Sequence, residues 1–196
     1  MNVVIIKYNA GNVRSVSFAL ERLGVQSVVS DIPEIIAKAD KVIFPGVGEA
    51  STAMRYLKEK KLDQLIVNLK QPVLGICLGM QLMCAFSEEG NTDCLKIFDQ
   101  KVLLFKSDTN AFKVPQMGWN NIENLKGPLF NGIKEKEYMY FVHGFYVEKG
   151  VHSIATTDYI LPYSSALQKN NFYAVQFHPE KSAEAGQKLI TNFLNL

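Results

Sequence analysis

Residues 71–79 read QPVLGICLG, an apolar run that leads directly into a second, mostly apolar run, MQLMCAF, over residues 80–86. The part before Cys77 favours a buried strand over residues 71–76, and the part after it favours a helix over residues 78–86. A strand that feeds directly into a helix is typical of an α/β protein. The stretch therefore predicts a sharp turn at Cys77, at the carboxyl edge of a sheet.

The rest of the first half repeats this alternation of strand and helix. Residues 3–6, 26–29 and 41–44 are short apolar runs typical of strands, and apolar residues at helical spacing fill residues 13–23. Pro33 marks the start of a short helix between the second and third runs. This α/β pattern indicates a mostly parallel central sheet flanked by helices.

The second half of the chain has a different texture. After about residue 95 the apolar runs become short and alternating, as over residues 138–147 and in the pair 165–168 and 172–177. Such runs predict antiparallel strands added to the sheet. Apolar residues on one helical face predict a closing helix over residues 183–196. We expect one domain over residues 1–196.

The bulk composition narrows the class of protein. Hydrophobic residues make up 47% and charged residues 20%, the balance of a globular chain, and 21 Lys and Arg against 19 Asp and Glu form no dense block for nucleic acid. No run is long enough to span a membrane, and the amino terminus lacks signal-peptide features. The three cysteines lack C-x-x-C spacing, which argues against a disulfide scaffold or zinc site. We expect a cytoplasmic protein without a metal.

Cys77 is the candidate nucleophile, because Gly75 precedes it by two residues and Gly79 follows it by two. This is the spacing of a nucleophile elbow with cysteine in place of serine. The next helix would point free N–H groups at the sulfur and favour the thiolate. A lone cysteine after an apolar strand is more often a core residue, but the paired glycines favour catalysis. We expect Cys84 in the core and Cys94 in a loop.

His178 is the candidate base, and it lies in the motif QFHPE at residues 176–180. Pro179 restricts His178 to extended backbone conformations, in which residues two apart face the same way. Glu180 can therefore orient one ring nitrogen while the other faces a nucleophile. The H-x-E pattern alone is weak, and its weight comes from the Cys77 elbow in the same chain.

Residues 45–48 read PGVG and follow the third predicted strand. Elbow-type hydrolases supply a backbone donor from this position. With the Leu78 N–H as the first donor, an amide from Val47 or Gly48 would complete an oxyanion hole. A phosphate-binding alternative would need a longer glycine fingerprint than this sequence has.

Three motifs together resemble those of the class I, or triad, glutamine amidotransferases. They are PGVG at residues 45–48, GICLGMQ at residues 75–81 and QFHPE at residues 176–180. Further segments narrow the resemblance to the glutaminase subunits that serve imidazole glycerol phosphate synthase in histidine biosynthesis. These segments are residues 10–16, 114–120 and 140–143, and Lys181 and Ser182 directly after the glutamate. The resemblance covers essentially the whole chain.

Two positions depart from the usual pattern of that family. Residues 7–12 read KYNAGN where the family usually has Asp-Tyr-Gly-x-Gly-Asn, and Gln116 stands where the family often has His. Neither departure touches the triad. We expect both to bear on the side that faces the partner.

The resemblance implies hydrolysis of L-glutamine, with Cys77 as nucleophile, His178 as general base and acid, and Glu180 as its orienter. It implies no cofactor. The residues it places around the amino-acid end of the substrate are Gly48, Gln81, His143 and Gly144.

The resemblance also implies a partner. Ammonia loses its nucleophilicity when protonated in water, so in this family it passes to a (β/α)8-barrel cyclase subunit. We expect Asn12, Trp119 and Lys181 near that interface.

Three other interpretations are compatible with parts of the sequence. The same glutaminase chemistry can serve another synthase, such as one that aminates a sugar or a nucleotide. A cysteine peptidase or γ-glutamyl hydrolase on the same architecture would act without a partner on larger substrates. A binding module without catalysis would have no use for an intact triad.

Overall fold

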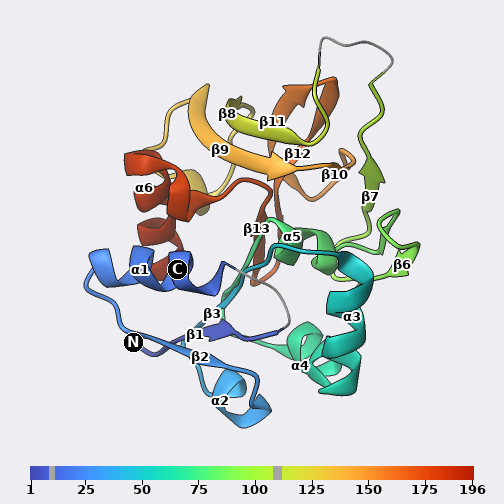
Figure 1. The fold of residues 1–196 in the computed structure, drawn as a ribbon. Helices are drawn as coiled ribbons and strands as arrows, with labels where there is room; N and C mark the ends of the chain where they lie inside the picture. The colour runs from blue at the N-terminus through green and yellow to red at the C-terminus, as the bar shows by residue number, and fades with distance from the viewer. Residues whose placement is uncertain (9–11, 108–111) are drawn as a thin grey trace.

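A computed structural model of the chain describes residues 1–8, 12–107 and 112–196. Residues 9–11, part of the amino-terminal segment that carries the family resemblance, lie outside the described residues. Figure 1 shows a central sheet with α1 and α6 on one side and α3 and α4 on the other.

The parallel half of the sheet is built from the apolar runs of the first half of the chain and one late strand. Its strands are β1 (Val3–Ile6), β2 (Ser27–Ser30), β3 (Lys41–Phe44), β4 (Val73–Ile76) and β13 (Phe172–Val175). They lie side by side in the order β2-β1-β3-β4-β13, and each neighbouring pair is parallel. The late strand β13 therefore brings the carboxyl-terminal motif next to the elbow that follows β4.

The second half of the chain extends this sheet beyond β13. The added strands are β5 (Phe86–Ser87), β6 (Thr92–Asp93), β7 (Lys101–Leu104), β10 (Phe145–Val147), β11 (Ser153–Tyr159) and β12 (Leu161–Lys169). The order continues β12-β10-β7-β5-β6, with β11 on β12, so that eleven strands of the described residues form one sheet. The neighbouring pairs are antiparallel except β5 and β7, which confirms a mostly parallel sheet with antiparallel additions.

Helices cover both faces of the sheet. One face carries α2 (Pro33–Ala37), α3 (Ala50–Glu59), α4 (Leu62–Asn68) and α5 (Leu78–Met83), and the other carries α1 (Val13–Arg22) and α6 (Ala183–Leu194). Alternate residues of β1 divide between these layers, because Val4 packs in the first core and Val3 in the second. A strand buried on both faces explains why its sequence is uniformly apolar.

Two predicted elements end earlier than the sequence pattern indicates. The helix expected over residues 78–86 stops at Met83, since Cys84 is extended and Phe86 pairs with Asp93 in β5 and β6. The run over residues 138–147 is two strands, β9 (Glu137–His143) and β10, separated by Gly144. β9 pairs with β8 (Gln116–Ile122) in a separate hairpin sheet, whereas β10 joins the main sheet. Short 3₁₀ turns, η1 (Pro128–Phe130) and η2 (Pro179–Lys181), complete the described elements.

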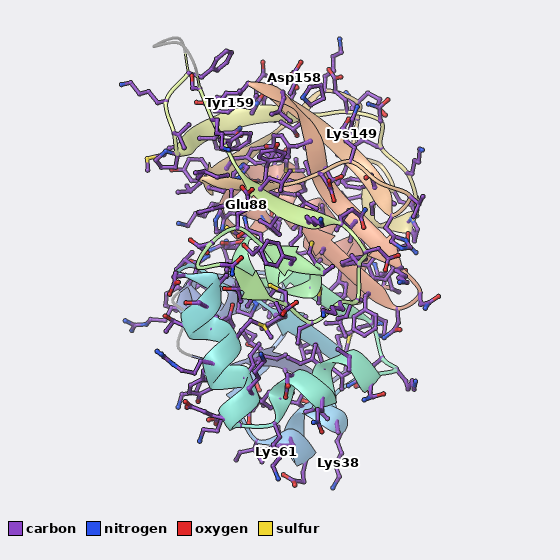
Figure 2. The ribbon with its side chains drawn as sticks, turned by 90° about the vertical axis from the view of Figure 1, so that its right-hand side faces the viewer. Lys38, Lys61, Glu88, Lys149, Asp158 and Tyr159 are labelled. Atoms are coloured by element: carbon purple, nitrogen blue, oxygen red, sulfur yellow. The ribbon has the colours of Figure 1, made fainter. Side chains whose placement is uncertain are left out.

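Charged side chains lie around the whole periphery of the molecule. Figure 2 shows Lys38 and Lys61 at one end and Lys149 and Asp158 at the other, and all four are exposed. Within the described ranges, no helix is both long and apolar enough to cross a membrane.

Candidate active site

Cys77 occupies the turn between β4 and α5 in an unusual backbone conformation, with φ 52° and ψ −108°. Such a conformation costs on the order of 1–3 kcal/mol and persists only where the surroundings impose it. Here the Cys77 N–H donates to the Val175 carbonyl at 2.8 Å, and its carbonyl accepts from the Gln81 N–H at 3.2 Å. The strand-to-helix turn predicted from the sequence is thus held at both of its ends.

The two glycines of the motif allow α5 to pack directly on the strands. A Cβ on Gly75 would lie 2.8 Å from the Met83 sulfur, and a Cβ on Gly79 would overlap the carbonyl oxygen of Phe44. The Gly75 Cβ would also lie 3.0 Å from the backbone of Gly79 and Met80, and neither this backbone nor that of Phe44 can move without shifting α5 or β3. The glycine spacing is therefore a packing requirement of the elbow.

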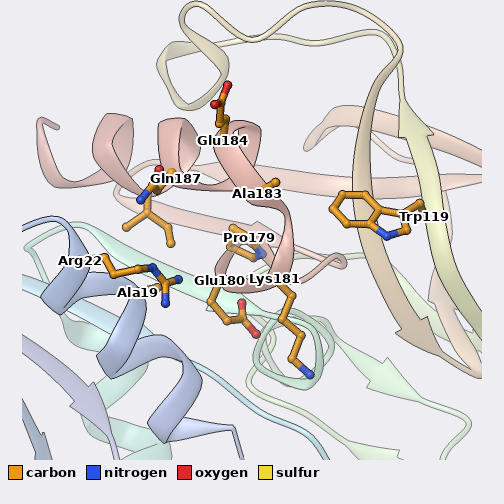
Figure 3. A pocket seen from close by; sticks show the side chains of 10 residues that line it. Ala19, Arg22, Trp119, Pro179, Glu180, Lys181, Ala183, Glu184 and Gln187 are labelled. Carbon is orange, nitrogen blue, oxygen red and sulfur yellow. The ribbon is translucent and has the colours of Figure 1, made fainter.

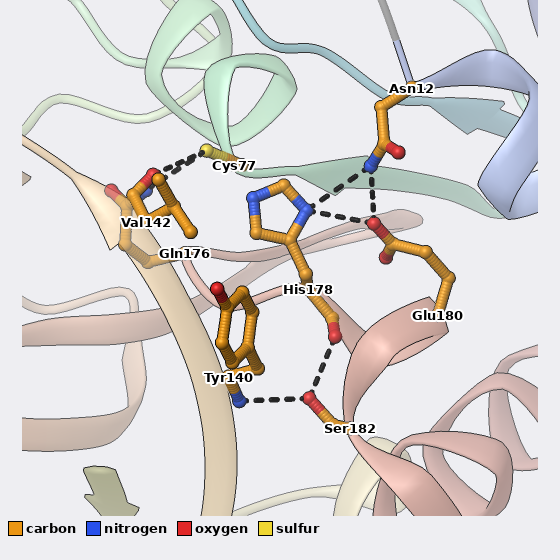
Figure 4. Close-up of polar contacts among 8 residues, drawn as sticks. All are labelled: Asn12, Cys77, Tyr140, Val142, Gln176, His178, Glu180 and Ser182. Atoms are coloured by element: carbon orange, nitrogen blue, oxygen red, sulfur yellow. Dashed lines mark hydrogen bonds and ion pairs between the residues drawn. The ribbon is translucent and has the colours of Figure 1, made fainter. Parts of the chain in front are cut away.

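His178 follows β13 with extended φ and ψ of −101° and 91°, as Pro179 predicts. Its backbone N–H donates to the Tyr140 carbonyl at 2.8 Å, and its carbonyl accepts from the Ser182 hydroxyl at 2.7 Å. The Ser182 oxygen also accepts from the Tyr140 N–H at 3.0 Å (Figure 4). These bonds fix the backbone of the histidine against β9.

The His178 ring lies between Cys77 and Glu180. Its Nδ1 is 2.8 Å from Glu180 Oε1, and the other edge of the ring faces Cys77 (Figure 4). Burial lowers the pKa of His178, but hydrogen bonds and charges from Cys77 and Glu180 outweigh burial and raise that pKa to about 10. The contacts with Cys77 and Glu180 therefore favour the protonated form of the ring.

Glu180 is buried, and it uses one of its two oxygens. Oε1 accepts from His178 and from the Asn12 side-chain amide, whereas Oε2 bonds to none of the described residues. The Asn12 amide nitrogen also lies 3.3 Å from His178 Nδ1. Asn12, expected at the partner interface, thus contacts the triad itself.

The loop at residues 45–48 lies against the elbow, as expected, and one of its carbonyl groups bonds to the first of the predicted oxyanion donors. The Leu78 N–H donates to the Gly46 carbonyl oxygen at 3.2 Å. Because C=O and N–H point in opposite directions across a trans peptide, the Val47 N–H faces away from this position. In this structure the Leu78 donor is occupied by the loop.

A cavity of about 250 Å³ opens in front of Cys77. It brings together the predicted nucleophile, the predicted oxyanion donors and the predicted substrate-binding residues. Its lining residues are Val47, Gly48, Cys77, Leu78, Gln81, Glu89, Pro115, Val142, His143, Gly144 and Phe145. The size and the position suit a small amino-acid substrate that reaches the sulfur.

His143 lines this cavity as a neutral, structural residue. Burial lowers its pKa to about 4, so Nδ1–H donates to the Phe145 carbonyl at 2.7 Å. The Tyr163 hydroxyl donates to the Gln116 side-chain oxygen at 3.0 Å, and its oxygen lies 3.2 Å from His143 Nε2. Gln116, expected on the partner-facing side, is instead buried behind the cavity wall.

Glu89 is a candidate site residue that sequence reasoning missed. It lines the cavity, is half-buried, and accepts from the Ala50 N–H at 2.8 Å. Burial raises the pKa of its carboxyl group. The sequence offers only the pair Glu88 and Glu89 before Gly90, and exposed acidic pairs are too common to signal a site.

A second cavity, of about 480 Å³, is lined in part by Glu180 (Figure 3). Residues of α1, β8 and α6 line it as well. Its lining residues are Ala19, Arg22, Trp119, Pro179, Glu180, Lys181, Ala183, Glu184, Gln187 and Ile190. Trp119 and Lys181, both expected at the interface, therefore share one cavity.

Comparison with protein families identifies the class defined by this fold and site. The model of the glutamine amidotransferase class-I family matches residues 4–196. The chain belongs to the class-I glutamine amidotransferases, and the expected family is confirmed.

Curated relatives narrow the comparison. The chain is 60% identical to imidazole glycerol phosphate synthase subunit HisH of Bacteroides fragilis over 100% of both chains. It is 58% identical to the HisH of Bacteroides thetaiotaomicron, again over 100% of both, and 46% identical to that of Vibrio cholerae over 100% of this chain and 98% of the relative.

Solved structures agree on the fold. A putative GMP synthase protein from Thermoplasma acidophilum superposes with a TM-score of 0.77 at 19% identity, over 100% of this chain and 93% of that one. PurLQS from Thermotoga maritima gives a TM-score of 0.71 at 16% identity, over 99% and 97%. At this identity the similarity supports the architecture alone.

Proposed function

We propose that this chain is the glutaminase subunit of an imidazole glycerol phosphate synthase in histidine biosynthesis. In this role it hydrolyses L-glutamine to L-glutamate and ammonia. The observation that carries the proposal is the Cys77–His178–Glu180 arrangement at a cavity of amino-acid size, with a 2.8 Å contact between the last two. Full-length identity of 60% to a HisH subunit supports the choice of synthase.

Polar groups of the cavity suit the amino-acid end of glutamine. Gln81 uses both of its N–H groups, on the Phe145 carbonyl and on Gln176, each at 3.0 Å. Its side-chain oxygen is left to accept from the substrate ammonium, beside the Glu89 carboxylate. Backbone groups at Gly48 and at His143 and Gly144 are the candidates for the substrate carboxylate.

The reaction follows from the charge state of the site. The Cys77 thiolate attacks the side-chain amide carbon of glutamine, and the His178 imidazolium gives its proton to the amide nitrogen, which leaves as ammonia. A glutamyl thioester remains. His178, now neutral, removes a proton from water, which hydrolyses the thioester. Backbone donors stabilise the oxyanion in both steps, at roughly 3–4 kcal/mol each.

The occupied first donor of the predicted oxyanion hole supports a resting state with low activity. The Gly46 carbonyl occupies the Leu78 N–H at 3.2 Å, so the peptide after Gly46 must rotate before both donors can face an oxyanion. Gly48, with φ 128°, lies in a conformation that glycine tolerates. A docked partner that favours the rotated peptide would switch the glutaminase on.

The proposed partner is a (β/α)8-barrel cyclase, which receives the ammonia. The surface of this chain on which the cyclase would dock surrounds the second cavity. Met117, Trp119 and Tyr138 are large, exposed side chains there, on the β8–β9 hairpin. Lys181 adds a charge to the same cavity. Asn12 contacts the triad directly, since its side-chain amide donates to Glu180 Oε1.

Three assays of glutamine hydrolysis test the proposal: the isolated chain, the chain with its barrel partner, and that complex with an acceptor analogue. One oxyanion donor is worth roughly 10²- to 10³-fold in turnover. We therefore expect at least that increase in the loaded complex, with a smaller change in KM. Full activity in the isolated chain, unchanged by partner and analogue, would instead favour a stand-alone hydrolase.

A further inference from the structure

Gln176 is the one residue of the QFHPE motif that is polar and has no part in the triad chemistry. It lies between β13 and His178, and its side chain is fully buried. Its backbone N–H donates to the Ser165 carbonyl at 2.9 Å, which fixes the residue in place. Figure 4 shows its side chain beside Cys77 and Val142.

A series of hydrogen bonds determines which end of the Gln176 amide faces Cys77. The Phe145 carbonyl can only accept, so Gln81 turns its side-chain nitrogen toward it, at 3.0 Å. The second N–H of this nitrogen donates to Gln176 Oε1 at 3.0 Å. Gln176 must therefore direct its Nε2 away from Gln81, and this nitrogen lies 3.7 Å from Cys77 Sγ.

The surroundings of the sulfur show why a donor is needed there. Sγ also lies 3.7 Å from the Val142 carbonyl oxygen, which can accept from a thiol. Once the thiol proton has moved to His178, the sulfur can only accept, and it carries its charge next to this carbonyl. Cys77 is 6% exposed, so water supplies little solvation. A buried charge needs hydrogen bonds from the protein, and bonds to charged groups are the stronger ones.

We propose that Gln176 is a further catalytic residue, whose side-chain N–H donates to the Cys77 thiolate and holds it charged and aimed at the substrate. This inference rests on the proposed role of Cys77 as the nucleophile. In the first step the S–C bond forms, the C–N bond breaks, and the proton travels from His178 to the departing nitrogen, which leaves as ammonia. Gln176 exchanges no proton in this step and lowers the energy of the charged sulfur.

Two substitutions separate the donor role from packing. Gln176→Glu keeps the shape of the side chain and the oxygen that accepts from Gln81, and it removes the N–H that faces the sulfur. Gln176→Leu removes both functions. A role in packing or in orienting Gln81 predicts that the glutamate variant behaves like the wild type and that the leucine variant is worse. The donor role predicts that Gln176→Glu is impaired more than Gln176→Leu, because a carboxylate beside the sulfur opposes the thiolate.

The measurement is the rate of iodoacetamide alkylation at Cys77 between pH 6 and 9, followed by peptide mapping. We expect Gln176→Leu to react about tenfold more slowly at pH 7, which moves the midpoint of the pH–rate profile up by about one unit. Gln176→Glu should react more slowly still. In the partner complex, Gln176→Glu should lower kcat at least tenfold with KM within about twofold.

Gln100→Leu is the matched control. Gln100 is also buried, and its side-chain amide bonds to none of the described residues. It should leave the alkylation profile unchanged. If Gln176→Leu fails to fold, Gln176→Glu against the wild type decides the question. A wild-type profile in Gln176→Glu would overturn the inference and leave the nucleophile assignment intact. If no glutamine analogue labels Cys77 in the wild-type chain, both the inference about Gln176 and the assignment of Cys77 as the nucleophile are overturned.

Discussion

The cavity at Cys77 and the cavity at Glu180 differ in what lines them. The cavity of about 250 Å³ at Cys77 is formed largely by loop backbone, apolar side chains and neutral amides, with Glu89 as its one acidic side chain. The cavity of about 480 Å³ at Glu180 is open and lined by Arg22, Lys181 and Glu184, together with an exposed tryptophan. The first suits chemistry on a small molecule, and the second suits contact with another protein.

Cys77, His178 and Glu180 connect the two cavities. Cys77 faces the first cavity, Glu180 forms a wall of the second, and His178 lies between them. Glu180 Oε2 is buried and bonds to none of the described residues. The Glu180 side chain has no exposed surface, so a change at the second cavity would reach His178 by moving Glu180, whose Oε1 lies 2.8 Å from the ring.

The largest expected effects come from breaking the link between the cavities. If the triad behaves like known ones, His178→Ala lowers kcat by about 10⁶-fold and Glu180→Gln by about 10⁴-fold. Glu180→Gln keeps His178 as the base but no longer fixes the tautomer and the orientation of the His178 ring. Steady-state hydrolysis in the partner complex measures both.

Glu184→Gln is the matched control for Glu180→Gln, since Glu184 is an exposed acid in the same cavity. It should change kcat by less than about twofold. Equal or greater damage from Glu180→Gln than from His178→Ala, at unchanged stability, would contradict the assigned roles.

A smaller effect is expected from truncation in the second cavity. Trp119 is 53% exposed there, and buried aromatic anchors at interfaces are commonly worth 2 kcal/mol or more. Trp119→Ala should weaken binding of the barrel partner by roughly 30-fold. Hydrolysis by the isolated chain should not change. Isothermal titration measures the affinity, with Val67→Ala on α4 as an exposed apolar control. If Trp119→Ala binds the barrel partner with unchanged affinity, the second cavity is not the docking face.

The smallest effect concerns stability and pH. The pKa of His178 is raised from 6.5 to about 10 in the folded state, so protonation favours folding. This contribution is complete below about pH 6.5 and is lost as pH rises to about 10. The stability difference between wild type and His178→Gln should therefore shrink over that range, as measured by urea unfolding. A difference that stays constant or grows with pH would show that the folded ring is not charged.

The sequence predicts most of the parallel sheet and the turn at Cys77, because both depend on short local patterns. Strand β3 has the predicted bounds, and glycine spacing reveals the elbow at Cys77. The run over residues 138–147 keeps one alternating pattern although it crosses from the hairpin to the main sheet at Gly144. Alternation reports which side chains face inward, and it does not report which sheet a strand joins.

Contacts between distant segments are the part of the site that the sequence pattern does not reveal. The bond from Asn12 to Glu180 joins residues 168 positions apart, and Asn12 precedes a helix where a capping residue is the ordinary interpretation. The family resemblance places Gln81 near the substrate, but no sequence pattern links Gln81 to Gln176. Their shared role emerges only when β4 and β13 lie side by side.

The most direct test of the account is to treat the chain with a glutamine-analogue diazo-ketone and map the labelled peptide. Burial raises the pKa of Cys84, and burial likewise raises that of Cys94 to about 12, so both thiols should stay unreactive near neutral pH. The account predicts label on Cys77, none on the other two, and protection by excess L-glutamine. Label on Cys84 or Cys94 with Cys77 free would contradict the assignment of Cys77 as the nucleophile.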